Sequence, residues 1–272
     1  MSSAEPALAP VFQLDQASYQ YADGAMGVRD VDLVIRAQER VALLGANGSG
    51  KSTLLKVLDG LLFPQAGRVR AFGQELQEQR LRDDGFSQVF RRMVGFVFQH
   101  SDAQLFSSTV WEEIAFGPVH MGFGDADVRQ RVADALALFG LEGVQDRPPF
   151  RLSGGEKKKV ALAAVMATNP AVLLLDEPTA GLDPRTQRGL LDMLTQFGRC
   201  GKTLITATHD LDTVEELADR VLVFGEDHRV VADGSPSTLL SDSALLLRVN
   251  LIDPRFHKHV HEGVHRHYHI HD

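Results

Sequence analysis

The sequence of 272 residues predicts an α/β fold with a mainly parallel sheet, N-terminal antiparallel strands and an inserted helical subdomain. Between residues 171 and 224, short apolar runs alternate with helical patterns, which is typical of βα units and a parallel sheet. The run at 171–175 is unbroken and fits a central strand. Residues 11–21 and 31–35 instead alternate apolar and polar side chains, as half-buried strands do. These patterns separate an antiparallel N-terminal part from a parallel core.

The helical subdomain is expected at about 100–168. Val128, Val132, Leu136 and Phe139 recur at helical spacing, and two prolines at 148 and 149 end that pattern. We interpret this stripe as core packing without chemistry. The chain then divides into a flexible N-terminus at 1–10, one large domain at 11–250 and a histidine-rich tail at 251–272.

Residues 45–52, Gly-Ala-Asn-Gly-Ser-Gly-Lys-Ser, fill every fixed position of the phosphate-binding loop found in P-loop nucleotide hydrolases. An apolar strand at 40–44 precedes the loop and a helical pattern at 51–62 follows it, which is the context that the motif needs. Lys51 is predicted to reach the β- and γ-phosphates of a bound polyphosphate, and Ser52 to hold Mg²⁺. The predicted nucleotide-binding residues here are Gly45, Asn47, Gly48, Ser49, Gly50, Lys51, Ser52 and Thr53.

Two carboxylates follow the apolar strand at 171–175. Asp176 and Glu177 stand at its C-terminal end, where ligands bind in open α/β sheets. Asp176 is predicted to hold Mg²⁺. Glu177 is predicted to act as the general base that activates water.

A second anion site is predicted at Ser153, Gly154 and Gly155, where a hydroxyl and two glycine N–H groups open a helix. One nucleotide does not need two such sites. Alone the motif is weak, but it lies between the phosphate-binding loop and the acidic strand end.

With these three motifs in order, the sequence resembles the nucleotide-binding subunits of ATP-binding cassette transporters over residues 11–240. The resemblance implies that two copies enclose two ATP molecules, with the 153–155 loop facing the nucleotide of the partner copy. It also implies roles for four further residues. Gln99 would touch Mg²⁺ and the attacking water, Asp183 would cross the dimer seam, His209 would contact the γ-phosphate, and Tyr21, with Tyr19 as its rival, would stack on adenine.

Two positions depart from the commonest pattern of that family. Glu156 stands where glutamine is usual, and Ala180-Gly181 stands where Ser-Ala is frequent. Neither change removes a group assigned to hydrolysis, so they bear on the rate rather than on the activity.

The composition limits the kinds of partner and the cellular compartment that the chain can have. A net charge of −8 without a basic stripe argues against nucleic acid as a partner. The single cysteine, Cys200, excludes an internal disulfide and favours a reducing compartment. We expect no signal peptide and no membrane span, so a role in transport would place the chain at the cytoplasmic face of the membrane through partner proteins.

The stretch after Gln99 is similar to the ATPases of energy-coupling-factor importers, which take up vitamins or transition metals. The resemblance implies that integral membrane coupling and substrate-binding subunits dock here. Leu105, Phe106, Trp111 and Phe116 would line the docking groove, although subdomain core is the competing interpretation for each.

Seven histidines stand between residues 257 and 271, a density that favours Co²⁺ or Ni²⁺ binding by neutral imidazoles. A solvated tail without a metal role, or an engineered scar, is the competing interpretation. The predicted ligands are His257, His259, His261, His265, His267, His269 and His271.

The leading hypothesis is therefore a homodimeric, Mg²⁺-dependent ATPase that powers cobalt or nickel import through membrane partners. Two alternatives stay open. One is a soluble metal-binding regulator or metallochaperone that uses ATP as a switch. The other is the ATPase of a vitamin importer with an incidental tail.

Overall fold

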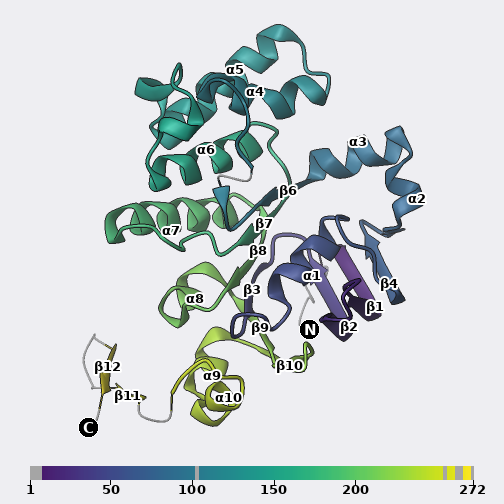
Figure 1. Ribbon diagram of the computed structural model, residues 1–272, viewed down its shortest axis with the longest axis vertical. Helices are drawn as coiled ribbons and strands as arrows, with labels where there is room; N and C mark the ends of the chain where they lie inside the picture. Colours follow the sequence, from purple (N-terminus) through teal and green to yellow (C-terminus); the bar gives the residue numbers. More distant parts are fainter. Residues whose placement is uncertain (1–7, 102–103, 254–255, 261–265, 271–272) are drawn as a thin grey trace, which may run out of the picture.

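The large domain contains two stacked sheets with helices between and around them (Figure 1). The computed structural model describes residues 8–101 and 104–253, and the backbone of 256–260 and 266–270. Sheet A is antiparallel with the order β2-β1-β4-β5. Its strands are β1 (Pro10–Gln20), β2 (Met26–Arg36), β4 (Ala66–Ala71) and β5 (Gln74–Glu75).

Sheet B has the order β10-β9-β3-β8-β7-β6 and is parallel except for the antiparallel pair β10–β9. The predicted fold class, a mainly parallel core with N-terminal antiparallel strands and a helical insertion, is therefore confirmed. The strands of sheet B are β10 (Val230–Gly234), β9 (Arg220–Phe224), β3 (Arg40–Leu44), β8 (Thr203–Thr208), β7 (Val172–Asp176) and β6 (Val94–Val97).

Apart from the edge strand β10, the strands of sheet B are buried on both faces, which is why they are mainly apolar without alternation. On β7, Leu174 packs into the core shared with sheet A, whereas Leu173 and Leu175 pack toward the helical subdomain. Helix α1 (Lys51–Leu58) lies between the two sheets and buries Leu54, Leu55 and Leu58 completely. Burial on this scale contributes about 1.5–3 kcal/mol for each leucine. It holds α1 against β2, β7 and β8.

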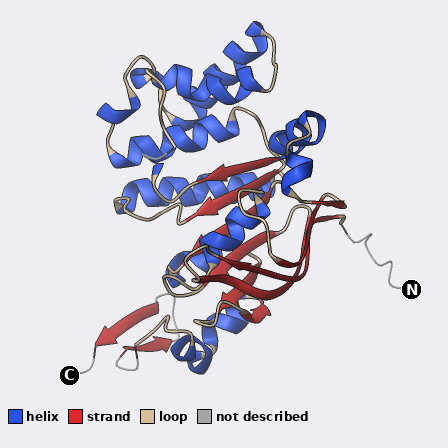
Figure 2. Cartoon of the chain, turned by 45° about the vertical axis from the view of Figure 1, so that its right-hand side comes forward, coloured by secondary structure: helices blue, strands red, loops and turns tan. Residues whose placement is uncertain are grey.

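The helical subdomain consists of α4 (Val110–His120), α5 (Asp125–Phe139) and α6 (Gly154–Met166) (Figure 2). The predicted stripe on α5 is buried against α4 and α6, as core packing requires. Helix α7 (Pro184–Arg199) covers the same face of sheet B and ends at the exposed Cys200. Helix α8 (Leu211–Leu217) and the C-terminal pair α9 (Pro236–Ser241) and α10 (Ser243–Arg248) pack against β3 and β9.

One local expectation differs from the structure, because helix α1 ends at Leu58 and not near residue 62. The polar stretch at 74–90, for which the sequence shows no clear pattern, contains α2 (Glu78–Leu81) and the first part of α3 (Asp84–Met93). Asp83 caps α3 by accepting from the N–H groups of Gly85 and Phe86. Phe90 is the one fully buried residue of α3. The apolar positions of this helix therefore give too weak a helical repeat to predict it from the sequence.

The ends of the chain give fewer observations. Strand β1 begins at Pro10, within the segment expected to be flexible, and residues 1–7 lie outside the described part. In the tail, β11 (Phe256–Val260) pairs with β12 (Arg266–Ile270) in an antiparallel ladder. Among the described residues, no helix is both long and apolar enough to cross a bilayer.

Candidate nucleotide site

The phosphate-binding loop joins β3 to α1 and depends on its glycines. Gly50 has φ 109°, and a Cβ there would stand 2.2 Å from the carbonyl oxygen of Gly27. A side chain at Gly50 is therefore excluded both by conformation and by space. Helix α1 starts at this point without a side-chain cap or an acidic residue in its first turn. Its N–H groups remain available to an anion.

A cavity of about 390 Å³ opens at this loop. It brings together the turn between β1 and β2, the loop, and residues that follow β6 and β7, which are separated by up to 156 positions in the chain. Its lining residues are Tyr21, Ala25, Met26, residues 47–53, Gln99 and Glu177. Most of the residues predicted for the nucleotide site thus share one cavity.

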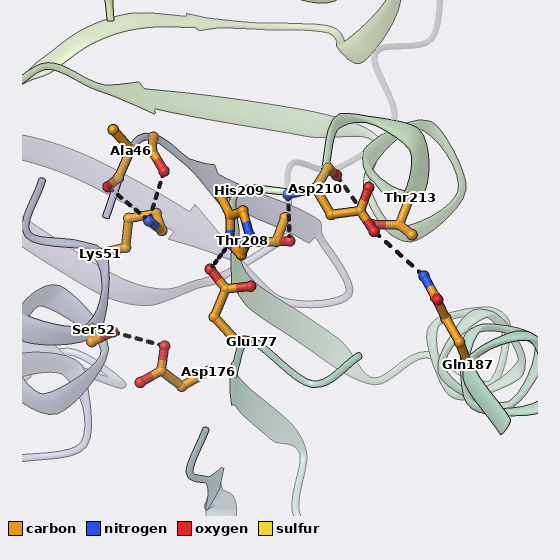
Figure 3. Close-up of polar contacts among 11 residues, drawn as sticks. Ala46, Lys51, Ser52, Asp176, Glu177, Gln187, Thr208, His209, Asp210 and Thr213 are labelled. Atoms are coloured by element: carbon orange, nitrogen blue, oxygen red, sulfur yellow. Dashed lines mark hydrogen bonds and ion pairs between the residues drawn. The ribbon is translucent and has the colours of Figure 1, made fainter. Parts of the chain in front are cut away.

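Lys51 is buried in the loop and its ammonium group faces inward. Its Nζ atom donates to the carbonyl oxygens of Gly45 at 2.7 Å and Ala46 at 3.1 Å (Figure 3). These bonds use two of its three donors and leave one for a phosphate oxygen. Burial lowers the pKa of Lys51, while the charges of Glu177 and Asp176 oppose that effect.

Ser52, which lines the cavity, is bonded to Asp176 at the end of β7. The hydroxyl of Ser52 donates to Asp176 Oδ1 at 2.8 Å, and Asp176 is 5% exposed. Gln99 lines the same cavity, so the residues here offer hydroxyl, carboxylate and amide oxygens, the hard donors that Mg²⁺ prefers. The residues present therefore fit a magnesium ion.

Glu177 occupies a strained position directly after β7. Its φ is 45°, and its N–H donates to the carbonyl of Ala207 at 2.9 Å, which holds the main chain there. The carboxylate is buried and bonds through Oε1 to Nδ1 of His209 at 2.7 Å (Figure 3). Because His209 is half exposed, it stands between Glu177 and solvent.

Tyr21, rather than Tyr19, lines the cavity. Its hydroxyl bonds to Thr53 Oγ1 at 2.9 Å, which ties the ring to the start of α1. Tyr19 packs edge-on against Tyr21, with 5.0 Å between ring centroids, and its other contacts are with the core. The position of Tyr21 suits an aromatic that covers a base.

The 153–155 loop is absent from the lining of this cavity. Ser153 caps α6 by accepting from the N–H of Glu156 at 3.3 Å, while the Glu156 carboxylate accepts from both the N–H and the hydroxyl of Ser153 at 2.8 Å. These bonds lower the pKa of Glu156. The loop expected to bind an anion thus carries a carboxylate that uses Ser153 as its own donor.

Asp183 has a local role in the fold that the sequence did not suggest. Its carboxylate accepts from the N–H groups of Arg185 and Thr186 and from the Thr186 hydroxyl at 2.6 Å, which caps α7. The hydroxyl and N–H of Thr186 lower the pKa of Asp183. The side chain is exposed at the surface that also carries Ala180 and Gly181.

Lys158 is a site residue that sequence reasoning missed. It is 3% exposed, and its Nζ donates to the carbonyl oxygens of Gln99 at 2.8 Å and Phe98 at 3.2 Å. Burial lowers its pKa to about 8, against the opposing charges of Asp176 and Glu177. A lysine run at 157–159 suggests a solvated face. The signal in the sequence was the apolar Leu162, one helical turn after Lys158, which indicates that this side of the helix is buried.

The segment after Gln99 exposes large aromatics. Phe106 is 66% exposed and meets the exposed Phe116 edge-on, with ring centroids 4.8 Å apart. The buried carboxylate of Glu113 accepts from the N–H groups of Phe106 and Ser107 and fixes this loop. Leu105 and Trp111 are instead partly buried against the subdomain core. The four residues expected in a groove therefore divide into an exposed pair and a core-facing pair.

The histidine tail gives only backbone information. The ladder of β11 and β12 places His257 opposite His269 and His259 opposite His267. His261, His265 and His271 lie outside the described residues. Metal binding by the tail stays a prediction.

Comparison with known proteins identifies the family. A family model described as ABC transporter matches residues 28–180. The nickel import ATP-binding protein NikO of Rhodobacter capsulatus is 48% identical over 248 residues, which are 90% of this chain and 97% of that protein. The energy-coupling factor transporter ATP-binding protein EcfA of Methanothermobacter thermautotrophicus is 40% identical over 245 residues, covering 90% of this chain and 77% of that protein.

Among solved structures, CbiO1 of Clostridium perfringens, part of the ABC transporter complex CbiONQ, matches with a TM-score of 0.75 and 36% identity. The match covers 90% of this chain and 96% of that chain. The resemblance to ATPases of energy-coupling-factor importers, stated from the segment after Gln99, is confirmed by these relatives. The chain therefore belongs to the ATP-binding subunits of ABC transporters, and it is an ATPase.

Proposed function

We propose that this chain hydrolyses ATP as a homodimer at the cytoplasmic face of the membrane and thereby powers the import of cobalt, or of nickel, through integral membrane partners. The observation that carries the ATPase part is the bond of 2.7 Å between Glu177 and His209 beside the phosphate-binding loop. The names of NikO and of the CbiONQ complex support the cargo.

In the proposed reaction, Lys51 and the loop N–H groups bind the phosphates of ATP, and Tyr21 covers the adenine. Ser52, Asp176 and Gln99 would hold Mg²⁺, which neutralises the charge on the phosphate oxygens when bound. Glu177 accepts a proton from the attacking water, and His209 orients the Glu177 carboxylate and contacts the γ-phosphate. The bond between Glu177 and His209 supports this division of roles.

The dimer is proposed because one chain leaves the site unfinished. The 153–155 loop begins α6 outside the cavity that holds Lys51, so it has no nucleotide to contact within its own copy. A second copy, turned head to tail, would bring this loop onto the γ-phosphate and Asp183 to the seam. ATP would then hold the two copies together, and hydrolysis would release them.

The test is the cobalt and nickel content of whole cells, measured by elemental mass spectrometry under metal limitation. Cells that carry the Glu177→Gln variant should contain less of one of the two metals than wild-type cells. A selective fall names the cargo. Unchanged contents of both metals contradict metal import and leave a vitamin as the cargo to examine.

A soluble metal-binding regulator or metallochaperone is the competing function. The exposed pair Phe106–Phe116 argues against it, because two adjoining exposed aromatics are costly unless a partner covers them. Purification of the chain from membranes together with integral membrane proteins supports the importer. Recovery from the cytosol alone, with transfer of metal to another protein, supports the regulator.

A further inference from the structure

Lys158 is a buried cation that the reaction described above does not use. It lies on α6 inside the helical subdomain, yet its ammonium group reaches out of that subdomain to the end of β6. A buried ammonium is unfavourable unless it is bonded, because burial removes its hydration. Lys158 meets this need with two main-chain carbonyls, those of Phe98 and Gln99.

These two carbonyls belong to the segment that brings Gln99 to the nucleotide cavity. Lys158 bonds to the main-chain carbonyl of Gln99, and Gln99 lines the nucleotide cavity, so this bond leaves the side-chain amide of Gln99 unused. The same segment has a second attachment, because Gln104 accepts from the N–H of Phe98 at 3.2 Å. Lys158 is the attachment that comes from a rigid helix.

Helix α6 also carries the 153–155 loop. Gly154 and Lys158 are four residues apart, and hence stand on the same side of the helix, one turn from each other. An α-helix of this length moves as one body, since each displacement of its first turn is transmitted through its hydrogen bonds. Movement of the loop toward a partner's nucleotide therefore displaces Lys158, and with it the main chain of Gln99.

We propose that Lys158 is a positioning residue that ties Gln99 of one copy to the 153–155 loop of the same copy, so that the two nucleotide sites of the dimer respond together. The inference rests on the roles given to Gln99 and the 153–155 loop under the proposed function. It does not depend on which cargo is transported.

The experiment compares Lys158→Met with Lys158→Arg and with the control Lys159→Met in the full-length chain. Methionine keeps a similar length without donors, whereas arginine keeps the charge and the donors. The control changes the adjacent lysine, which has no bond to Phe98 or Gln99 and does not line the nucleotide cavity. Steady-state ATP hydrolysis gives kcat and KM, and hydrogen–deuterium exchange without nucleotide reports on the peptide that contains residues 96–104.

We expect Lys158→Met to lower kcat about 10- to 100-fold with KM for ATP little changed, as misplacement of a group at the reacting atoms does. Exchange in the 96–104 peptide should rise in this variant. Lys158→Arg should recover part of kcat and of the protection, and Lys159→Met should match the wild type. A merely structural role would not separate kcat from KM in this way.

Unchanged exchange in the 96–104 peptide of Lys158→Met overturns the anchoring itself, whatever the activity. Raised exchange with unchanged kcat overturns the positioning role but leaves the ATPase assignment intact. If Lys158→Met loses thermal stability, Lys158→Arg becomes the variant that tests the proposal. In Lys158→Arg, raised exchange in the 96–104 peptide with an undiminished kcat contradicts the proposal. Each of these outcomes is distinct from failure of metal import, which the cellular metal content measures.

Discussion

Glu177 is the residue proposed to act most directly in hydrolysis. Its carboxylate is buried beside the phosphate-binding loop, and its main chain has φ 45°, a conformation that costs a non-glycine residue about 1 kcal/mol or more. The bond from its N–H to Ala207 and the bond from its side chain to His209 hold it there. The strain places the carboxylate at the cavity wall instead of along the strand.

Replacement of Glu177 by glutamine removes the proposed base but keeps the shape of the side chain. We expect kcat to fall about 10²- to 10⁴-fold, while dimers still form in Mg²⁺ and ATP. Turnover is measured by phosphate release and dimer formation by size-exclusion chromatography. The exposed Glu142 offers a control, Glu142→Gln, which should behave as wild type. Undiminished turnover in Glu177→Gln would remove Glu177 as the base.

At the scale of elements, Asp59 joins α1 to α3. Its carboxylate stands just after α1, is 7% exposed, and pairs with Arg91 at 2.9 Å. Burial raises the pKa of Asp59 to about 6, and Arg91 opposes this only in part because its own side chain is 38% exposed. Helix α1 therefore starts at the phosphate-binding loop and ends beside a carboxyl group whose ionisation is disfavoured by burial.

This pKa has a consequence for stability with a definite sign. Between its ordinary value of 3.8 and about 6, the folded state binds the proton that the unfolded state has lost. The free energy of unfolding of the wild type, relative to that of Asp59→Asn, should therefore fall as pH rises through this window, by about 3 kcal/mol at most. Urea denaturation at pH 4 and pH 7 measures it. A relative gain for the wild type would mean that Arg91 outweighs burial.

Glu113 fixes the loop that carries Phe106. In Glu113→Ala the N–H groups of Phe106 and Ser107 lose their acceptor, so we expect the free energy of unfolding to fall by about 1–3 kcal/mol. The exposed neighbour Glu112 provides the control Glu112→Ala, which should cost less. Urea denaturation compares the two. An equal loss in both variants would mean that the loop does not depend on Glu113.

At the scale of the whole molecule, Glu156 sets a charge at the seam of the proposed dimer. Its carboxylate caps α6 beside the loop that would meet the partner's γ-phosphate, so two negative groups would face each other. Glutamine completes a capping box as glutamate does, but without the charge. The repulsion should be modest, since Glu156 is solvent-accessible and salt screens it.

In a Glu177→Gln background, Glu156→Gln should tighten ATP-dependent dimerisation about two- to fivefold, the scale of one exposed charge interaction. Analytical ultracentrifugation at low and high salt measures the dissociation constant, and the difference should shrink as salt rises. A weaker dimer in Glu156→Gln would show that the capping carboxylate organises the loop more than it repels phosphate.

Features of the fold and the site could be predicted from the sequence where the local structure restricts which residue can stand at a position. Gly50 is readable because the loop excludes any side chain there, and β8 at 203–208 is readable because it is a buried central strand. Lys158 and Glu113 were missed because their functions arise only when distant segments pack around them. Helix α3 was not predicted because it buries one residue, Phe90, and a single buried position gives no helical repeat of apolar residues.

The end of α7 gives the molecule a built-in reporter. Cys200 is the single thiol in the sequence and is exposed, so a maleimide probe attaches at one known place without any engineered cysteine. In a homodimer the two probes form a symmetric pair. The distance between them, followed by double electron–electron resonance, gives a ruler for the opening and closing of the native, unmutated enzyme through its ATP cycle.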